Sequence, residues 1–271
     1  MGLVINTNVA ALNAARTLSS STQQLNQTLQ RLSSGLRINS AADDAAGLAI
    51  ASGFQAQVQG TQQAQRNAQD GVSLVQTGDG ALSQTTDILQ RIRQLAVQAA
   101  NGTQSAANRS SLQNEVSQLL SQVDDIAQRT QFNGISILSA AQTVTLQSGA
   151  NQGQTLAVGV AGASTRDLGI SNVNISSIAG AVAALSTLDT AIQSVSTLRS
   201  SFGAFQNRLQ FTLNTLAIQE QNSTAAESSI RDANIATETI NFTREQILVS
   251  AGTSVLAQAN IVPQTALQLL K

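Results

Sequence analysis

Two pairs of adjacent acids, Asp43-Asp44 and Asp124-Asp125, are the residues whose types and spacing come nearest to chemistry in this chain. The sequence contains no His, Cys, Tyr or Trp, so general acid–base work would fall to carboxylates. Neighbouring residues on a helix point about 100° apart, so neither pair can converge on one atom. Such acids ordinarily cap helices or make surface contacts, and we predict that the chain is not an enzyme.

No cofactor or metal motif accompanies those acids. A metal site without Cys or His would need oxygen ligands that converge from elsewhere, and nothing in the sequence indicates them. Gly78-Asp79-Gly80 lacks the preceding strand and the third glycine of a dinucleotide-binding loop. The predicted catalytic, cofactor-binding and metal-binding sets are therefore empty.

The composition favours long helices over a compact globule. Charged residues make up 11% of the chain, against about 25% in an average globular protein. The net charge is −1 and Lys271 is the sole lysine, so no basic patch is present to bind nucleic acid. Surfaces of amides and hydroxyls would let identical copies pack side by side without repulsion between like charges.

The sequence also argues against membrane insertion and a cleaved leader. No uninterrupted apolar run approaches the roughly 20 residues of a membrane-spanning helix. The opening segment MGLVINTNVAALNAARTL lacks the basic stretch of a secretory signal peptide.

Apolar residues at helical spacing predict four helical regions. They cover about the first 35 residues, roughly 42–100, about 105–129, and a region from near 180 to the end. Gly35 is predicted to interrupt the first region, and Gly78 and Gly80 to loosen the second. Sustained steps of three and four residues are typical of coiled coils and helical bundles.

The period changes between 130 and 180. Asn133-Gly134 is a turn signal between apolar residues. The stretch TVTLQSGANQGQTLAVGV alternates apolar and polar residues around a centre rich in Gly, Asn and Gln, which predicts a β-hairpin. We therefore expect a small β module at about 131–178, inserted between helices.

Both ends of the chain carry apolar stripes that the middle does not cover. The last residues, SVLAQANIVPQTALQLLK, are apolar almost throughout, whereas chain ends are usually polar. The two ends could pair with each other, but a pair of helices leaves its outer faces in water. Another partner is therefore expected to cover them.

Six segments, in order, resemble bacterial flagellins, and the resemblance covers essentially the whole chain. They are INTNVAALNA, QRLSSGLRINSAADDAAGLAIA, LQRIRQLAVQAANGT, QFNG, IRDANIATE and ANIVPQTALQLLK. The resemblance implies a mainly α fold of long antiparallel helices. Residues 1–43 and 230–271 would pair as a terminal coiled coil called D0, and residues 44–229 would form D1, a rod of three to four helices with a small β-hairpin. It implies a minimal member without outer variable domains.

The function implied by the resemblance is that of a secreted structural subunit, which self-assembles into the extracellular filament of the bacterial flagellum for swimming motility. The homopolymer would be helical, because a head-to-tail contact that does not close generates a fibre. The residues expected to pack within D0 and between subunits are Ile5, Val9, Leu12, Leu256, Ile261, Val262, Leu267, Leu269 and Leu270.

The resemblance implies further partners. Export would use the flagellar type III apparatus, and an export chaperone of the FliS type would cover residues from about 230 to 271. A filament cap and hook–filament junction proteins would contact the assembled polymer, and host receptors in innate immune recognition would read it. The patch that matches the site of a flagellin-sensing Toll-like receptor is Gln90, Arg91, Arg93, Leu95 and Glu115. Gln94 departs from that pattern, which usually has an acid there.

Two other functions remain open at this point. A hook–filament junction protein shares the terminal pattern, but is not expected to carry LQRIRQLAVQAANGT and QFNG so intact. An amphipathic membrane-active secreted protein is disfavoured, because the apolar stripes lack flanking Lys and Arg.

Overall fold

The computed structural model describes residues 7–268, and the side chains of residues 7–261. The chain divides into two compact units. Unit 1 comprises Met1–Ala56 and Asn222–Lys271, and unit 2 comprises Gln57–Gln221. Two long helices, α2 (Ala45–Ala100) and α4 (Ile178–Arg231), contribute residues to both units.

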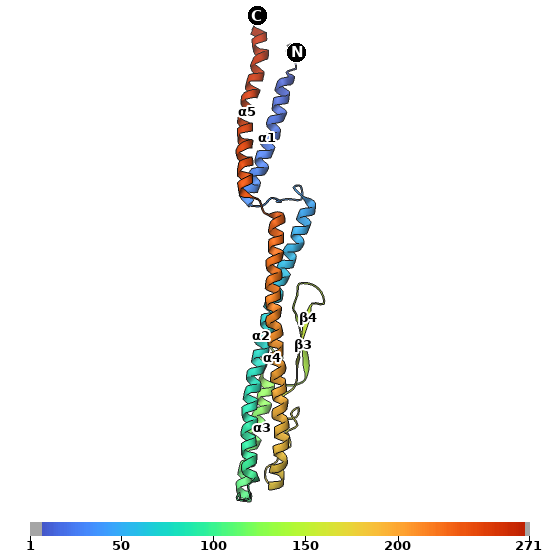
Figure 1. Ribbon diagram of the computed structural model, residues 1–271, viewed down its shortest axis with the longest axis vertical. Helices are drawn as coiled ribbons and strands as arrows, with labels where there is room; N and C mark the ends of the chain where they lie inside the picture. Colours follow the sequence, from blue (N-terminus) through green and yellow to red (C-terminus); the bar gives the residue numbers. More distant parts are fainter. Residues whose placement is uncertain (1–6, 269–271) are drawn as a thin grey trace. The chain divides into compact units, whose positions relative to one another are not determined.

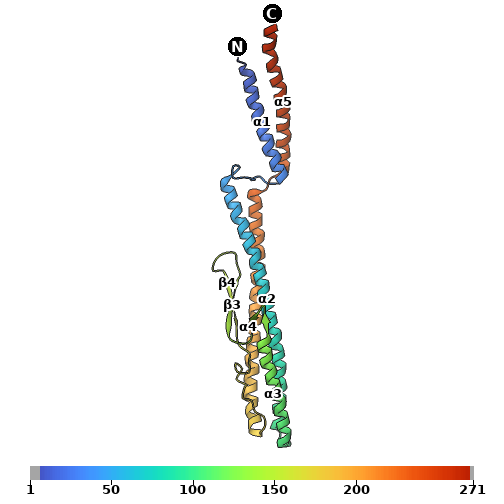
Figure 2. The ribbon, with the colours of Figure 1, turned by 180° about the vertical axis from the view of Figure 1, so that it is seen from behind.

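Unit 1 is built around two antiparallel helices that lie side by side, α1 (Val9–Ser34) and α5 (Ile235–Gln268) (Figures 1 and 2). The Asn8 side chain caps the start of α1 by accepting a 3.0 Å hydrogen bond from the Ala11 backbone N–H. Gly35 ends α1 in the left-handed conformation, with φ 71°, and its N–H donates to the Arg31 carbonyl. The predicted interruption at Gly35 is confirmed.

The segment after α1 is tied to the end of α4 by backbone hydrogen bonds within unit 1. The Arg37 N–H donates to the Arg231 carbonyl at 2.7 Å, and the Ala233 N–H donates to the Gly35 carbonyl at 2.9 Å. The helical region predicted to begin near 180 consists of two helices, α4 and α5, because residues 232–234 leave the helix to make this contact. Asn234 restarts it as the N-cap of α5, accepting from the Thr237 N–H.

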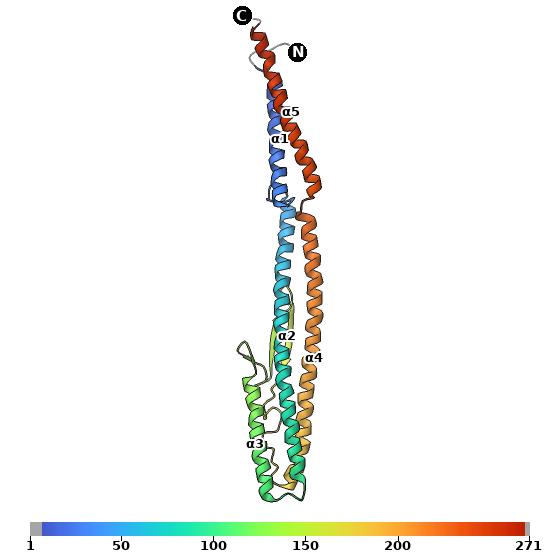
Figure 3. The same ribbon diagram turned by 90° about the vertical axis from the view of Figure 1, so that its left-hand side faces the viewer.

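Three helices form the frame of unit 2: the part of α2 after residue 56, the part of α4 before residue 222, and α3 (Ala106–Arg129) beside α2 (Figure 3). The prediction that Gly78 and Gly80 loosen the second helical region is wrong, since α2 is continuous through both. Gly78 serves packing instead, because a Cβ there would stand 2.5 Å from the Phe202 ring.

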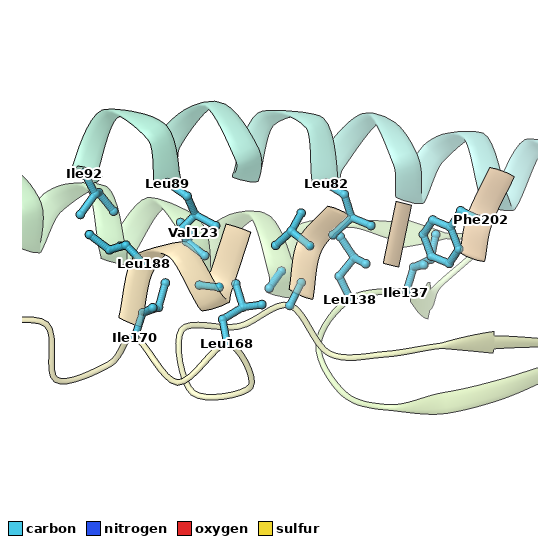
Figure 4. Packing of buried hydrophobic residues seen from close by; sticks show 14 of the residues in the cluster. Leu82, Leu89, Ile92, Val123, Ile137, Leu138, Leu168, Ile170, Leu188 and Phe202 are labelled. Carbon is cyan, nitrogen blue, oxygen red and sulfur yellow. The ribbon is translucent and has the colours of Figure 1, made fainter. Parts of the chain in front are cut away.

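The core of unit 2 joins all three helices to the chain between them (Figure 4). Leu89 of α2, Val123 of α3 and Leu188 of α4 are fully buried together. The other labelled members of this packed cluster are Leu82, Ile92, Ile137, Leu138, Leu168, Ile170 and Phe202. Burial of large apolar side chains at this density stabilises the rod by about 1.5–3 kcal/mol for each one.

Two short antiparallel hairpins follow α3. β1 (Gln131–Phe132) pairs with β2 (Ile135–Ser136) across the Asn133-Gly134 turn, and β3 (Gln142–Gln147) pairs with β4 (Thr155–Val160). The residues of β4 alternate between exposed and buried positions, and Leu156, Val158 and Val160 occupy the buried ones, as a strand with one covered face requires. The predicted turn at Asn133-Gly134 and the predicted hairpin, β3–β4, are both confirmed.

α4 is more apolar than the sequence analysis allowed. It contains an 18-residue window with a mean hydropathy of 1.3, so its length and composition alone would let it cross a membrane. In unit 2 it instead buries Ala184, Leu188 and Val195 against the core, and 28% of that window is buried.

Candidate assembly surface

The contact between α1 and α5 follows the spacing of a coiled coil. The residues of α1 that are buried or half-buried recur at alternating steps of three and four, as one face of a helix requires. They are Ala11, Ala14, Leu18, Ser21, Leu25, Thr28 and Leu32, and Arg31, next to Leu32, is half-buried as well. On α5 the matching positions are Glu238, Phe242, Glu245, Val249, Gly252, Leu256 and Ala259.

Three contacts fix the antiparallel register of this pair. The Asn8 side-chain amide donates to the Ala259 carbonyl at 2.8 Å. A Cβ on Gly252 would stand 3.2 Å from Leu18 Cδ1, so the two helices approach closely there. At the other end, Arg31 Nη1 lies 3.7 Å from Glu238 Oε1.

The apolar side chains at this contact are half-buried, and among those described none is fully buried. The buried residues of α1 are Ser21 and Thr28, both polar, and Glu238 is the buried residue among the described side chains of α5. Among the side chains described for α1 and α5, none belongs to the buried apolar core. Arg31 Nε and Glu245 Oε2 are buried without a hydrogen-bond partner, which costs free energy. The pair is therefore marginal by itself, because isolated helices also have to overcome a nucleation cost.

α5 carries a second row of apolar side chains, which we call the outer stripe. Its members are Ile240, Ile247, Val255 and Ile261, and they are between 46% and 62% exposed. Ile240 and Ile247 each lie two residues after a position that contacts α1, which turns them about 200° around the helix. A helix that is apolar on opposite faces is normally buried on both. We therefore expect the outer stripe to be covered by another protein surface.

The sequence-predicted packing residues divide between the two faces. Val9 and Leu12 are more than half exposed on α1, Ile261 belongs to the outer stripe, and Leu256 is half-buried against α1. Ile5, Leu269 and Leu270 lie outside the described residues. Val262 and Leu267 fall within α5, but their side chains also lie outside what the structure describes.

The residues predicted for receptor contact lie on unit 2, and the structure brings some of them together. Arg91 Nη2 contacts Glu115 Oε1 at 2.8 Å, joining α2 to α3, and Gln90 is exposed beside them. Arg93 Nε instead contacts Asp189 Oδ1 of α4 at 2.6 Å, and this hydrogen bond lowers the pKa of Asp189. Leu95 is 1% exposed and faces the core.

Two polar side chains hold the irregular segment 161–177: Asp124, for which the sequence predicted a cap or a surface contact, and Gln113, which the sequence did not single out. The Asp124 carboxylate accepts hydrogen bonds from the Thr165 N–H at 2.8 Å and from the Thr165 hydroxyl at 2.9 Å. The Gln113 amide bonds the backbone of Val173 and Ile175. Gln113 stands in no recognisable motif, and the acid pair that contains Asp124 gave no indication of its partner. Among the described residues, no three acidic side chains gather as metal ligands would.

Comparison with models of protein families identifies the family to which the chain belongs. A model of the bacterial flagellin N-terminal helical region matches residues 5–143, and a model of the C-terminal helical region matches residues 185–270. The chain belongs to the bacterial flagellin family. Between the two matched regions of this flagellin lie most of the β3–β4 hairpin, the segment 161–177 and the start of α4.

Individual relatives match this flagellin along nearly its whole length. It is 41% identical to the flagellar filament 33 kDa core protein of Treponema phagedenis, over 99% of this chain and 100% of that one. It is 42% identical to the flagellin of Bacillus subtilis, over 98% of this chain and 99% of the other. The flagellins are a family of structural proteins.

Solved structures agree with the fold. The crystal structure of Bacillus cereus flagellin matches with a TM-score of 0.50 and 38% identity, covering 60% of this chain and 94% of that one. A structure assigned as a flagellar hook-associated protein from Vibrio parahaemolyticus matches with a TM-score of 0.59, covering 70% of this chain and 100% of that one. Its identity is 12%, so it shows the fold alone.

Proposed function

We propose that this flagellin is the structural subunit of an extracellular flagellar filament, the polymer that drives swimming. The outer stripe of α5 carries the proposal, because a solitary chain leaves its apolar side chains in water. These side chains are 46–62% exposed, so completing the burial of each one against a neighbouring subunit is worth roughly half of a full burial, which contributes about 1.5–3 kcal/mol. Assembly and stabilisation of unit 1 then become one event.

The distribution of charge suits repeated contact between identical chains. The described side chains of α5 include three charged residues, Glu238, Arg244 and Glu245, and two of these face α1. The outer stripe is free of charge, so copies of α5 can approach one another without repulsion. A contact between two different surfaces of the same chain does not close, and it propagates as a helical fibre.

In this proposal unit 1 corresponds to the terminal coiled coil D0 and unit 2 to the rod D1. The D0 boundaries inferred from the resemblance are 1–43 with 230–271. The compact units divide within α2 after Ala56 and within α4 before Asn222. The ends of the two long helices would therefore move with the terminal pair rather than with the rod.

Before assembly, when no neighbouring subunit is present, another protein has to cover the apolar side chains of the outer stripe. An export chaperone of the FliS type would supply a groove for α5, and Ile240 and Ile247 have the seven-residue spacing of helix-in-groove anchors. Export through the flagellar type III apparatus, and contacts with the filament cap and hook–filament junction proteins, complete the proposed set of partners. The exposed Arg91–Glu115 pair supports a contact between unit 2 and a host Toll-like receptor.

The experiment that tests the proposal is seeded polymerisation followed by electron microscopy. The full chain should elongate filament seeds, and a chain truncated after Ile235, which lacks nearly all of α5, should not. An Ile247→Ser variant should elongate seeds more slowly, whereas Thr243→Ser, at an exposed polar position of the same helix, should behave like the full chain. Elongation by the truncated chain would overturn the proposal. Binding of the monomer to lipid vesicles in place of polymerisation would favour the membrane-active alternative.

A further inference from the structure

We propose that Asn101 is a site of spontaneous deamidation, at which the backbone nitrogen of Gly102 displaces the side-chain amide of Asn101. The reaction takes water as its only co-reactant and needs no enzyme. It exchanges a neutral amide for a carboxylate in the loop between α2 and α3. The proposal rests on that loop alone, and does not depend on filament formation.

The chain contains two Asn-Gly pairs, Asn101-Gly102 and Asn133-Gly134. All four residues are exposed to solvent. Glycine has no Cβ, so nothing shields its backbone nitrogen from the side chain before it. The two pairs are chemically alike, and their surroundings decide which one reacts.

The conformation of the loop after α2 favours attack of the Gly102 backbone nitrogen on the Asn101 side chain. The Thr103 N–H donates a hydrogen bond to Asn101 Oδ1 at 3.1 Å, which folds the side chain forward along the chain in an Asx-turn. The ring closed by this hydrogen bond contains both Asn101 Cγ and the Gly102 nitrogen. Within residues 7–268, the Gly102 N–H donates no hydrogen bond, and no heavy atom lies within 4 Å of the place where a Gly102 Cβ would stand. The attacking nitrogen is therefore free.

The same contacts favour the transition state. As the bond between the Gly102 nitrogen and Asn101 Cγ forms, negative charge develops on Asn101 Oδ1, where the Thr103 N–H already donates. The Gly102 nitrogen loses its proton to solvent, the Cγ–Nδ2 bond breaks, and the amide leaves as ammonia. Water then opens the cyclic imide to aspartate or isoaspartate. The Arg109 guanidinium, 3.5 Å from the Asn101 carbonyl oxygen, stabilises the added negative charge.

Asn133 is held away from this chemistry by its turn. Asn133 and Gly134 both adopt the left-handed conformation, with φ 49° and φ 78°, between the paired residues Phe132 and Ile135. For the Gly134 nitrogen to reach the Asn133 side chain, the backbone has to rotate out of this turn and open the β1–β2 pair. The folded chain therefore protects Asn133.

The test follows both sites in one molecule. The full-length chain is incubated at mildly alkaline pH, folded in dilute buffer or unfolded in guanidinium chloride, and samples are digested at arginine. The two sites fall on separate peptides, 94–109 and 130–166, whose mass spectra report conversion, and fragmentation separates Asn101 from Asn108. Released ammonia is measured in parallel.

In guanidinium chloride the two sites should react at similar rates. In the folded chain Asn101 should react roughly tenfold faster than Asn133, or more, which corresponds to a cost of about 1.4 kcal/mol for opening the turn. A Gly102→Ala variant has open space for its methyl group and should fold normally, but react more slowly at Asn101. Equal rates at the two sites in the folded chain, or unchanged conversion in Gly102→Ala, would overturn the proposal.

Discussion

Gly78 of α2 lies so close to Phe202 of α4 that a Cβ on residue 78 would stand 2.5 Å from the ring. Phe202 is 2% exposed and cannot move aside easily. We expect Gly78→Ala to lower the free energy of unfolding by about 1–3 kcal/mol, the usual cost of an extra methyl group in a filled core. Urea denaturation followed by circular dichroism measures this change.

Gly80, two residues later on the same helix, is the matched control. No heavy atom lies within 4 Å of a Cβ at that position. Gly80→Ala should raise the free energy of unfolding by about 0.5–1 kcal/mol, because alanine is the better helix former. Equal effects of the two substitutions would show that α2 and α4 do not approach as described.

Asp124 should matter to stability far more than its neighbour Asp125. Asp124→Ala leaves the buried Thr165 N–H and hydroxyl without their acceptor, which should cost about 1–3 kcal/mol. Asp125 makes an exposed ion pair with Arg129, so Asp125→Ala should cost about 0.5 kcal/mol or less. Urea denaturation compares the two variants. The account of segment 161–177 fails if the Thr165 amide keeps its protection from hydrogen exchange in Asp124→Ala.

Glu220 should make the free energy of unfolding of unit 2 depend on pH in the acidic range. Hydrogen bonds from the side-chain amides of Gln62 and Gln65, at 2.7 and 2.8 Å, lower the pKa of Glu220 below its ordinary value of 4.5. Because the pKa is lower in the folded state, the stabilisation is fully present above pH 4.5 and is lost as the pH falls through the folded-state value.

The measurement for Glu220 is the midpoint of urea unfolding across the acidic range. Glu220→Gln should flatten the acid dependence relative to the unsubstituted chain. Replacing Gln62 and Gln65 together by alanine should flatten it equally, since the donors are then missing. An acid dependence that survives both changes unaltered would refute the role of this contact.

Much of the fold could be predicted from the sequence, because its elements depend on local spacing. The helices follow from apolar residues every three or four positions, the β3–β4 hairpin from alternation around a centre rich in Gly and Asn, and the β1–β2 turn from Asn133-Gly134. The interruption at Gly35 is also predictable locally, because glycine commonly ends a helix. The capping role foreseen for the acid pairs holds at Asp44, which accepts from the Gly47 N–H at the start of α2.

The features that could not be predicted depend on residues distant in the chain. The role of Gly78 is set by Phe202, which lies more than a hundred residues away. The break at 232–234 follows from pairing with residues 35–37, and the contact of Asp124 follows from Thr165. Leu95 stands in the same motif as exposed residues, but the position of α3 and α4 determines that it faces inward.

The central claim is that other copies of the chain cover the outer faces of α1 and α5 in the filament. Hydrogen exchange in monomer and filament tests this claim most directly. The account predicts that amides of α1 and α5 exchange rapidly in dilute monomer and become strongly protected in the filament, while amides around Leu89 and Val195 are protected in both. Equal protection of α1 and α5 in monomer and filament would contradict it.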